Sequence, residues 1–311
     1  LLFVLLICLL VVAFLFPSHL FLETSPMIGS AWSLQDPGVS GWVFLPGLKV
    51  LQYEILQNHN FLWSNLKGLG MPLLGNELQE APLYPLTLAL LWVPEPYFWN
   101  VFVVLRWLIL GSGAFFLASF CFRLKPAGAL VFVLTFVFSF YHLRWMNHPF
   151  LNGIAAGTWY LFFLLSIIQD TGRYVLGPRM TGLLIGLSIA AYSVLTCGFP
   201  ESSLTVAAIT LMVTPIFVVR RISINRYGLI TPILVVGAAH MIALVLAAPQ
   251  LLSLIEFIEL TNPGFRGQHG LHQINEHLGN FFLKQLMWSG TPKTYDHFTH
   301  IFGLIPVFLF L

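Results

Sequence analysis

Carboxylates are the side chains of this sequence best suited to chemistry. Asp36 precedes Pro37 early in the chain. Glu77 and Glu80 stand three residues apart, on one side of a helical turn if one forms there, and Glu201 follows a Gly-Phe-Pro sequence. A carboxylate beside a hydroxyl can take its proton as a general base. The structural alternatives are that Asp-Pro opens a turn and that a helix dipole attracts Glu201.

Basic side chains offer a second function, the binding of a phosphate. Arg144 and His148 flank a short connection and Arg266 lies in a long polar segment; solvation or a lipid headgroup is the alternative partner for each. Arg106 stands inside an apolar run, where a charge is costly, so we expect it to be paired or to line a cavity. The histidines between 269 and 300 fit no zinc-ligand spacing. No cofactor is therefore expected, and a divalent metal stays an open alternative.

Apolar runs must position these groups. Of the 311 residues, 58% are hydrophobic and only 8% are charged, more apolar surface than a soluble fold could hide. A hydrocarbon core about 30 Å thick is crossed by helices or closed barrels, and the length of the runs predicts an all-α, polytopic transmembrane helical bundle. The predicted spans lie near residues 1–17, 98–120, 126–142, 150–168, 180–196, 202–219, 229–248 and from 300.

Basic residues set the orientation of this bundle. With the N-terminus inside, the short inner loops hold seven Lys or Arg residues and the short outer loops hold only Arg144, as the positive-inside rule requires. Acidic residues play no part in that choice, yet eleven of the twelve fall outside and only Asp170 falls inside. Either acidic residues go wherever Lys and Arg do not, or carboxylate chemistry takes place on the outer face.

Two large extracytoplasmic loops result from this threading, at 18–97 and 249–299, and loops of that length usually carry function. Apolar residues at helical spacing within 45–58 predict a helix on the membrane surface. The span ending near 248 is expected to continue outward as an amphipathic helix, with Gln250 on its polar face and Ile255 on its apolar face. Because apolar runs are cut at both ends, 1–311 is predicted to be one domain truncated at both ends.

The segment 62–85 is rich in Gly and Pro, which favours bent backbone over helix. Such backbone needs internal hydrogen-bond partners at a membrane surface, and burial is expected for its Trp and Tyr rings. Four of its side chains can supply those partners: Trp63, Asn65, Asn76 and Tyr84.

Longer motifs connect these segments. Asp36 is followed by "LWSNLKGLGMPLLGNELQEAPLYPL" and by a span ending in "FCFRLK". "MNHP" at 146–149, "GFPESSL" at 198–204 and "AAPQLLSLIEFIELT" at 247–261 come next. In order and spacing, this succession resembles the YfhO-like branch of the GT-C glycosyltransferases, and the likeness covers most of the chain.

The resemblance implies a GT-C-like integral-membrane glycosyltransferase. Its donor would be a sugar on a polyprenyl phosphate, and its acceptor a cell-envelope glycan or lipid on the extracytoplasmic side. Asp36 matches the family's catalytic base, while Glu77, Glu80 and Glu201 are candidates for a second acidic group. Glu77 to Glu80 is more acidic than the family pattern, which leaves open which carboxylate is the base. Substrate contacts are expected from Trp63, Asn65, Asn76, Tyr84, Asn147 and His148, and phosphate contacts from Arg144 and Arg266.

Two other classes of function fit the composition. A lipid or glycolipid transporter or flippase would also place charges in the membrane, but no internal repeat is visible. A non-catalytic envelope-assembly scaffold would not need the outer carboxylates. A net charge of +2 without a basic run outside short loops excludes a nucleic-acid-binding face. The expected location is the cytoplasmic membrane of a bacterium, with the lipid-linked sugar, its acceptor and membrane lipids as partners.

Overall fold

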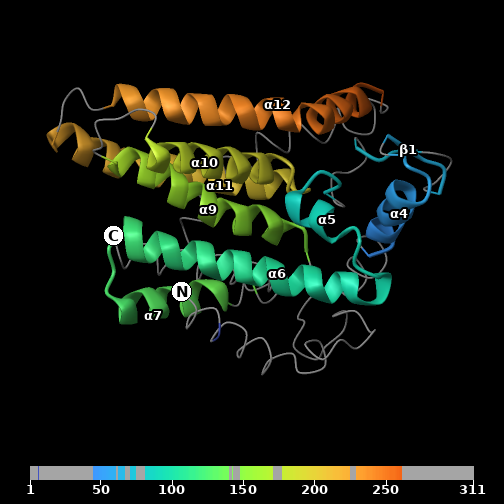
Figure 1. Cartoon of the computed structure of the whole chain (residues 1–311), viewed down its shortest axis with the longest axis horizontal. Coiled ribbons are helices and arrows are strands. Elements are labelled where there is room, and N and C mark those ends of the chain that lie inside the picture. Colours follow the sequence, from blue (N-terminus) through green and yellow to red (C-terminus); the bar gives the residue numbers. More distant parts are fainter. Residues whose placement is uncertain are drawn as a thin grey trace, which may run out of the picture.

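The computed structural model of the chain describes residues 6, 45–60, 62–66, 71–74, 81–139, 142, 148–170, 177–224 and 229–260. Helices dominate these residues, and Figure 1 shows the long ones side by side as a bundle. The elements are α4 (Leu45–Leu56), β1 (Trp63–Ser64), β2 (Met71–Pro72), α5 (Pro85–Leu90), α6 (Glu95–Phe116), the π-helical turn η2 (Leu117–Cys121), α7 (Pro126–Val137), α9 (Phe150–Gln169), α10 (Pro178–Leu195), α11 (Pro200–Ile224) and α12 (Ile230–Leu260).

Five helical stretches in the described part of the chain are long and apolar enough to cross a membrane, which indicates a membrane protein. They coincide with five of the predicted spans and confirm the helical bundle at that level. They are Tyr97–Cys121, Phe150–Gln169, Pro178–Leu195, Pro200–Ser223 and Ile230–Glu256.

The predicted span at 126–142 differs from the structure. α7 has 12 residues and ends at Val137, because Phe138 leaves the helical region with φ −96° and ψ 22°. A helix of that length extends about 18 Å, well short of a bilayer core. The predicted spans at 1–17 and from 300 lie outside the described residues.

Proline begins four of the helices. Pro85, Pro126, Pro178 and Pro200 are the first residues of α5, α7, α10 and α11. The pyrrolidine ring fixes φ near the helical value, and the missing N–H has no partner to lose in a first turn. The residues that bound the apolar runs in the sequence therefore also set the starts of these helices.

Small residues on α9 allow a close approach to α11. A Cβ added to Gly153 would lie 2.1 Å from Ser202 Oγ, and one added to Gly157 would lie 2.4 Å from Val206 Cγ2. Both contacts are too short for any side chain, so this Gly-x-x-x-Gly face packs directly on one turn of α11. α9 also contacts α6, α10 and α12, which makes it the central helix of the described bundle.

Figure 1 shows α4, β1 and α5 at one end of the bundle, beside the first turn of α6. Leu48, Leu51 and Ile55 of α4 are buried, as their spacing predicts. Gln52 Nε2 donates to Leu91 O at 2.6 Å and to Val93 O at 2.7 Å. These bonds join α4 to the connection between α5 and α6, so α4 is fixed on the bundle.

The helical continuation of the last span is confirmed, because α12 extends to Leu260. The predicted assignment of its faces is wrong at two positions. Gln250 is 1% exposed and Ile255 is 52% exposed. In a bilayer an exposed Ile meets lipid at little cost, whereas a polar amide is better placed inside the protein, so the rule for water-facing helices reverses.

Candidate functional site

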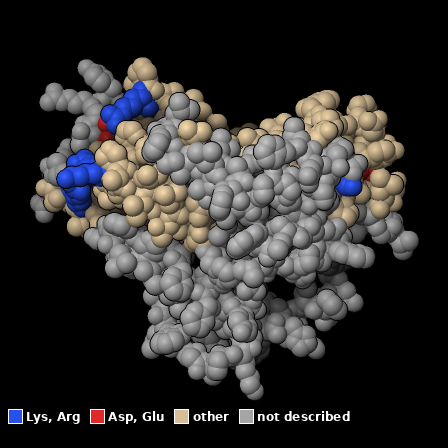
Figure 2. Space-filling model, turned by 90° about the horizontal axis from the view of Figure 1, so that it is seen from below, with Lys and Arg blue, Asp and Glu red and all other residues tan. Residues whose placement is uncertain are grey.

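Charged residues separate onto the two ends of the described bundle. The basic end lies where η2, α9 and α11 finish and α7 and α10 begin, and it carries Arg123, Lys125, Asp170, Arg179, Arg220 and Arg221. Figure 2 shows the blue side chains gathered mainly at that end. The opposite end, called the α5 end, contains α4, β1, β2, α5 and the starts of α6, α9 and α11. This separation agrees with the alternation of loops predicted from the sequence.

Arg106 is the centre of a polar cluster between α6 and α9, toward the α5 end. Its side chain is 1% exposed. Nη1 donates to Asn152 Oδ1 at 3.0 Å and to His148 O at 3.1 Å. The guanidinium carbon lies 5.4 Å from the ring centroid of Phe102, within cation–π range. The expectation that this arginine is paired is therefore confirmed, and Asn152 is a partner that the sequence did not identify.

Asn152 connects the arginine to two further segments. Its Nδ2 donates to Cys197 O at 3.1 Å. Its main-chain oxygen accepts a bond from the Tyr84 hydroxyl at 3.3 Å. Burial raises the pKa of the Tyr84 phenol, so the hydroxyl keeps its proton and remains a donor at physiological pH. One asparagine thus joins α9 to the segment before α5 and to the segment before α11.

His148 completes this cluster from the start of α9. Its ring meets the ring of Phe199 edge-on with centroids 4.6 Å apart, and its Nδ1 accepts the Phe150 N–H at 3.2 Å. Burial and, to a smaller extent, the charge of Arg106 lower the pKa of His148 to about 4. Its ring is therefore neutral at physiological pH, and it could contact a phosphate by a hydrogen bond but not by charge.

Glu54 is a buried carboxylate at the α5 end. It is 3% exposed, and its two oxygens accept bonds of 2.6 Å from Ser64 Oγ and from Asn58 Nδ2. The bonds from Ser64 and Asn58 lower the pKa of Glu54. Because both oxygens are engaged and the anion is favoured, Glu54 is a weak base that fixes β1 on α4. Glu54 belongs to no motif and was not predicted as a site residue. The signal for it in the sequence is its position next to Ile55 on the apolar face of α4.

Trp63 is 46% exposed, so the predicted burial of its ring is wrong. Successive residues of a strand face opposite sides, and Ser64 takes the inward side to reach Glu54. The indole Nε1 donates to Asn65 Oδ1 at 3.0 Å. The backbone partner of this turn is instead Asn60, which bonds Leu62 N, Trp63 N and Trp63 O.

The other predicted site residues divide into three groups. Tyr84 and His148 join the Arg106 cluster, Tyr84 through its bond to Asn152 O and His148 through the bond that its O accepts from Arg106. Glu201 is exposed in the first turn of α11, where the helix dipole suffices to explain a carboxylate. Seven others lie outside the described residues: Asp36, Asn76, Glu77, Glu80, Arg144, Asn147 and Arg266.

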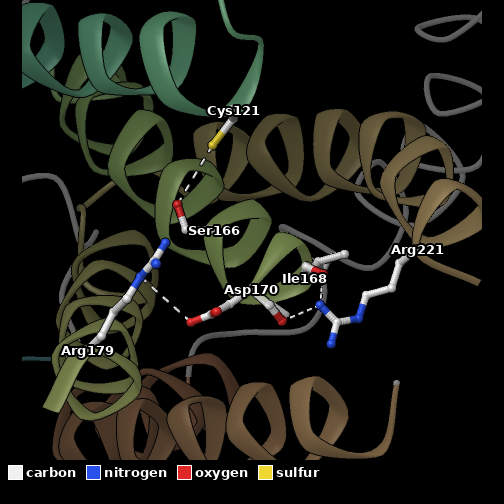
Figure 3. Close-up of polar contacts among 6 residues, drawn as sticks. All are labelled: Cys121, Ser166, Ile168, Asp170, Arg179 and Arg221. Carbon is white, nitrogen blue, oxygen red and sulfur yellow. Dashed lines mark hydrogen bonds and ion pairs between the residues drawn. The ribbon is translucent and has the colours of Figure 1, made fainter. Parts of the chain in front are cut away.

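The basic end contains a network that closes the last turn of α9 (Figure 3). Arg179 Nε lies 3.7 Å from Asp170 Oδ2. Arg221 Nη1 donates to Ile168 O at 2.8 Å and to Asp170 O. Basic side chains satisfy the carbonyls that a helix C-terminus leaves without partners, so this network has a structural role. Within the described ranges no group of three His, Cys, Asp or Glu side chains could hold a metal.

Comparisons of the chain with protein-family models, with curated proteins and with solved structures found no match. The motifs and the geometry around Arg106 therefore carry the functional inference.

Proposed function

We propose that the protein is an integral-membrane glycosyltransferase of the GT-C type. It would transfer a sugar from a polyprenyl phosphate to a cell-envelope glycan or lipid at the α5 end of the bundle, on the extracytoplasmic side of a bacterial cytoplasmic membrane. The basis is the resemblance of the motifs, together with the way three of them come together in space.

The convergence of motif segments is the observation that supports this proposal best. Tyr84 belongs to "LYPL", His148 to "MNHP" and Phe199 to "GFPESSL". These segments are far apart in the sequence, yet all three meet around Arg106 and Asn152. A buried cation that is hydrogen-bonded to neighbouring segments fixes the geometry of those segments, which a transferase needs to orient two substrates.

In the proposed reaction the acceptor hydroxyl oxygen forms a bond to the anomeric carbon of the sugar. The bond from that carbon to the phosphate oxygen breaks, and polyprenyl phosphate leaves with the electron pair. The Asp36 carboxylate takes the hydroxyl proton. Arg144 and Arg266 are the candidates to stabilise the charge on the departing phosphate. Glu77, Glu80 and Glu201 are the candidates for a second acidic group.

The decisive experiment replaces Asp36 with Asn, which keeps the size of the side chain and removes the proton acceptor. Transfer from a panel of radiolabelled polyprenyl-phosphate sugars is measured with the purified full protein. A general base is worth roughly two to four orders of magnitude in rate, so the variant should lose that much with an unchanged melting temperature. Asp170→Asn is the matched control and should transfer normally, because Asp170 and its partner Arg179 lie at the basic end, away from the α5 end.

Near-normal transfer by Asp36→Asn would exclude Asp36 as the base and direct attention to Glu77, Glu80 or Glu201. Movement of the labelled lipid across a bilayer without transfer would instead favour the transporter or flippase alternative. Absence of both activities, with intact assembly of a partner complex, would favour the scaffold.

A further inference from the structure

We propose that the basic end binds the headgroup of an anionic phospholipid through Arg123, Lys125 and Arg220. This inference is independent of the proposed transferase activity. It rests on a strained arginine, on the cations placed around it and on the apolar surface beside them.

Arg123 has a left-handed backbone conformation, with φ 56°. It follows the π-helical turn η2, at whose end Phe122 N donates to Leu117 O at 3.1 Å and Leu124 N donates to Ala118 O at 3.0 Å. Glycine is the usual residue at such a helix end, because a Cβ makes the left-handed conformation unfavourable. The chain thus carries a long cation where glycine would fold more easily, and a task for its guanidinium explains that choice.

Two more exposed cations lie at the same end of the bundle as Arg123. Lys125 follows two residues later, before α7. Phe122 packs against Phe217 of α11 with ring centroids 6.3 Å apart. Arg220 lies one turn beyond Phe217, so this contact brings it to the same end of the bundle.

The remaining cations of this end have internal partners. Arg221 caps α9, and Arg179 pairs with Asp170. In contrast, the side chains of Arg123, Lys125 and Arg220 make no hydrogen bond or ion pair with another described residue. Their charge is therefore directed to a group outside the described protein.

Exposed apolar side chains adjoin these cations. Phe120 is 59% exposed three residues before Arg123, and Val219 is 66% exposed next to Arg220. Acyl chains suit such a surface, while a phosphate above them suits the guanidinium and ammonium groups. A phospholipid with a net negative charge provides both chemistries in one molecule.

The test compares melting temperatures of the full protein in nanodiscs of phosphatidylcholine and in nanodiscs that also contain phosphatidylglycerol. The wild type should melt higher with phosphatidylglycerol. Arg123→Gln should lose most of that increase, whereas Arg123→Lys should keep it. The amount of lipid retained in native mass spectrometry should fall about fivefold for each cation removed, because one Lys or Arg near an anionic surface raises the affinity by about that factor. Lys49→Gln, at the α5 end, should keep the full increase.

Arg123→Gly provides a second, opposite readout. In phosphatidylcholine alone it should melt about 2 °C higher than the wild type, because the strain is relieved, yet it should lose the response to phosphatidylglycerol. An equal response of wild type and Arg123→Gln would overturn the proposal, as would a wild type that does not respond. Stabilisation by inorganic phosphate in phosphatidylcholine nanodiscs would also refute a lipid as the occupant.

Discussion

The hydrogen bond between Arg106 and Asn152 should behave as a strongly coupled pair. Asn152→Leu keeps a side chain of four heavy atoms branched at Cγ and removes the charge-assisted bond of 3.0 Å together with the bond of 3.1 Å to Cys197 O. A bond to a charged group contributes about 1.5–3 kcal/mol and a neutral one about 1 kcal/mol, so the variant should lose about 2.5–4 kcal/mol. At about 2–4 °C per kcal/mol, its melting temperature should fall by about 5–15 °C.

Arg106→Met removes the cation and leaves Asn152 Oδ1 and His148 O without this donor. Each buried acceptor left unsatisfied costs about 1–3 kcal/mol, so we expect a loss of about 2–6 kcal/mol. The double variant replaces donor and acceptor with apolar groups, which is often much less destabilising than removing one partner. The two effects should therefore fall short of additivity by about 1.5–3 kcal/mol.

Thermal unfolding of the wild type, both single variants and the double variant in one detergent measures this coupling. Asn65→Leu is the matched control, because Asn65 is exposed next to β1 and its replacement should change stability by less than about 0.5 kcal/mol. Additive losses in the double variant would refute the pairing of Arg106 with Asn152. A loss for Asn152→Leu no larger than that of the control would show that the cluster does not hold the segments together.

Two further predictions concern packing and pH. Gly157→Ala should destabilise the protein by about 1–3 kcal/mol, because its Cβ would lie 2.4 Å from Val206. Gly182→Ala is the control and should be neutral or stabilising by up to about 1 kcal/mol, because no atom lies within 4 Å of its Cβ. Equal melting temperatures for the two variants would contradict the close contact of α9 with α11. Glu54 has a pKa below its usual 4.5 in the folded protein, so its stabilising effect is present above that value and is lost as the pH falls through the folded pKa. The melting temperature should therefore drop on acidification below about 4.5, and Ser64→Ala should make that drop shallower; identical acid profiles for the two proteins would disprove the role of Ser64.

Patterns that depend on backbone chemistry could be predicted from the sequence. Apolar length placed five spans, and proline marked helix starts, because both follow from the cost of unsatisfied backbone groups in lipid. The buried face of α4 followed from the spacing of Leu48, Leu51 and Ile55. These signals are local, so a single sequence contains them.

Features that depend on distant contacts could not be predicted in the same way. The partner of Arg106 is 46 residues away along the chain, and no spacing rule connects the two. Trp63 is exposed because Ser64 takes the inward position to reach Glu54, a contact that alternation cannot reveal without knowing which side α4 occupies. Gln250 is buried because lipid, unlike water, favours apolar residues on the outside of a helix.

The Arg106 cluster also constrains how the motifs should be interpreted. Tyr84, His148 and Asn152 hold three segments in place through hydrogen bonds to one another and to Arg106. Similarity to a family at such structural residues is evidence of a shared arrangement of segments, and it is weaker evidence of a shared reaction. Loss of transfer in a Tyr84→Phe protein would therefore be evidence of a substrate contact only if its melting temperature were unchanged. Asp36, whose replacement by Asn keeps shape and removes a proton acceptor, tests the chemistry itself.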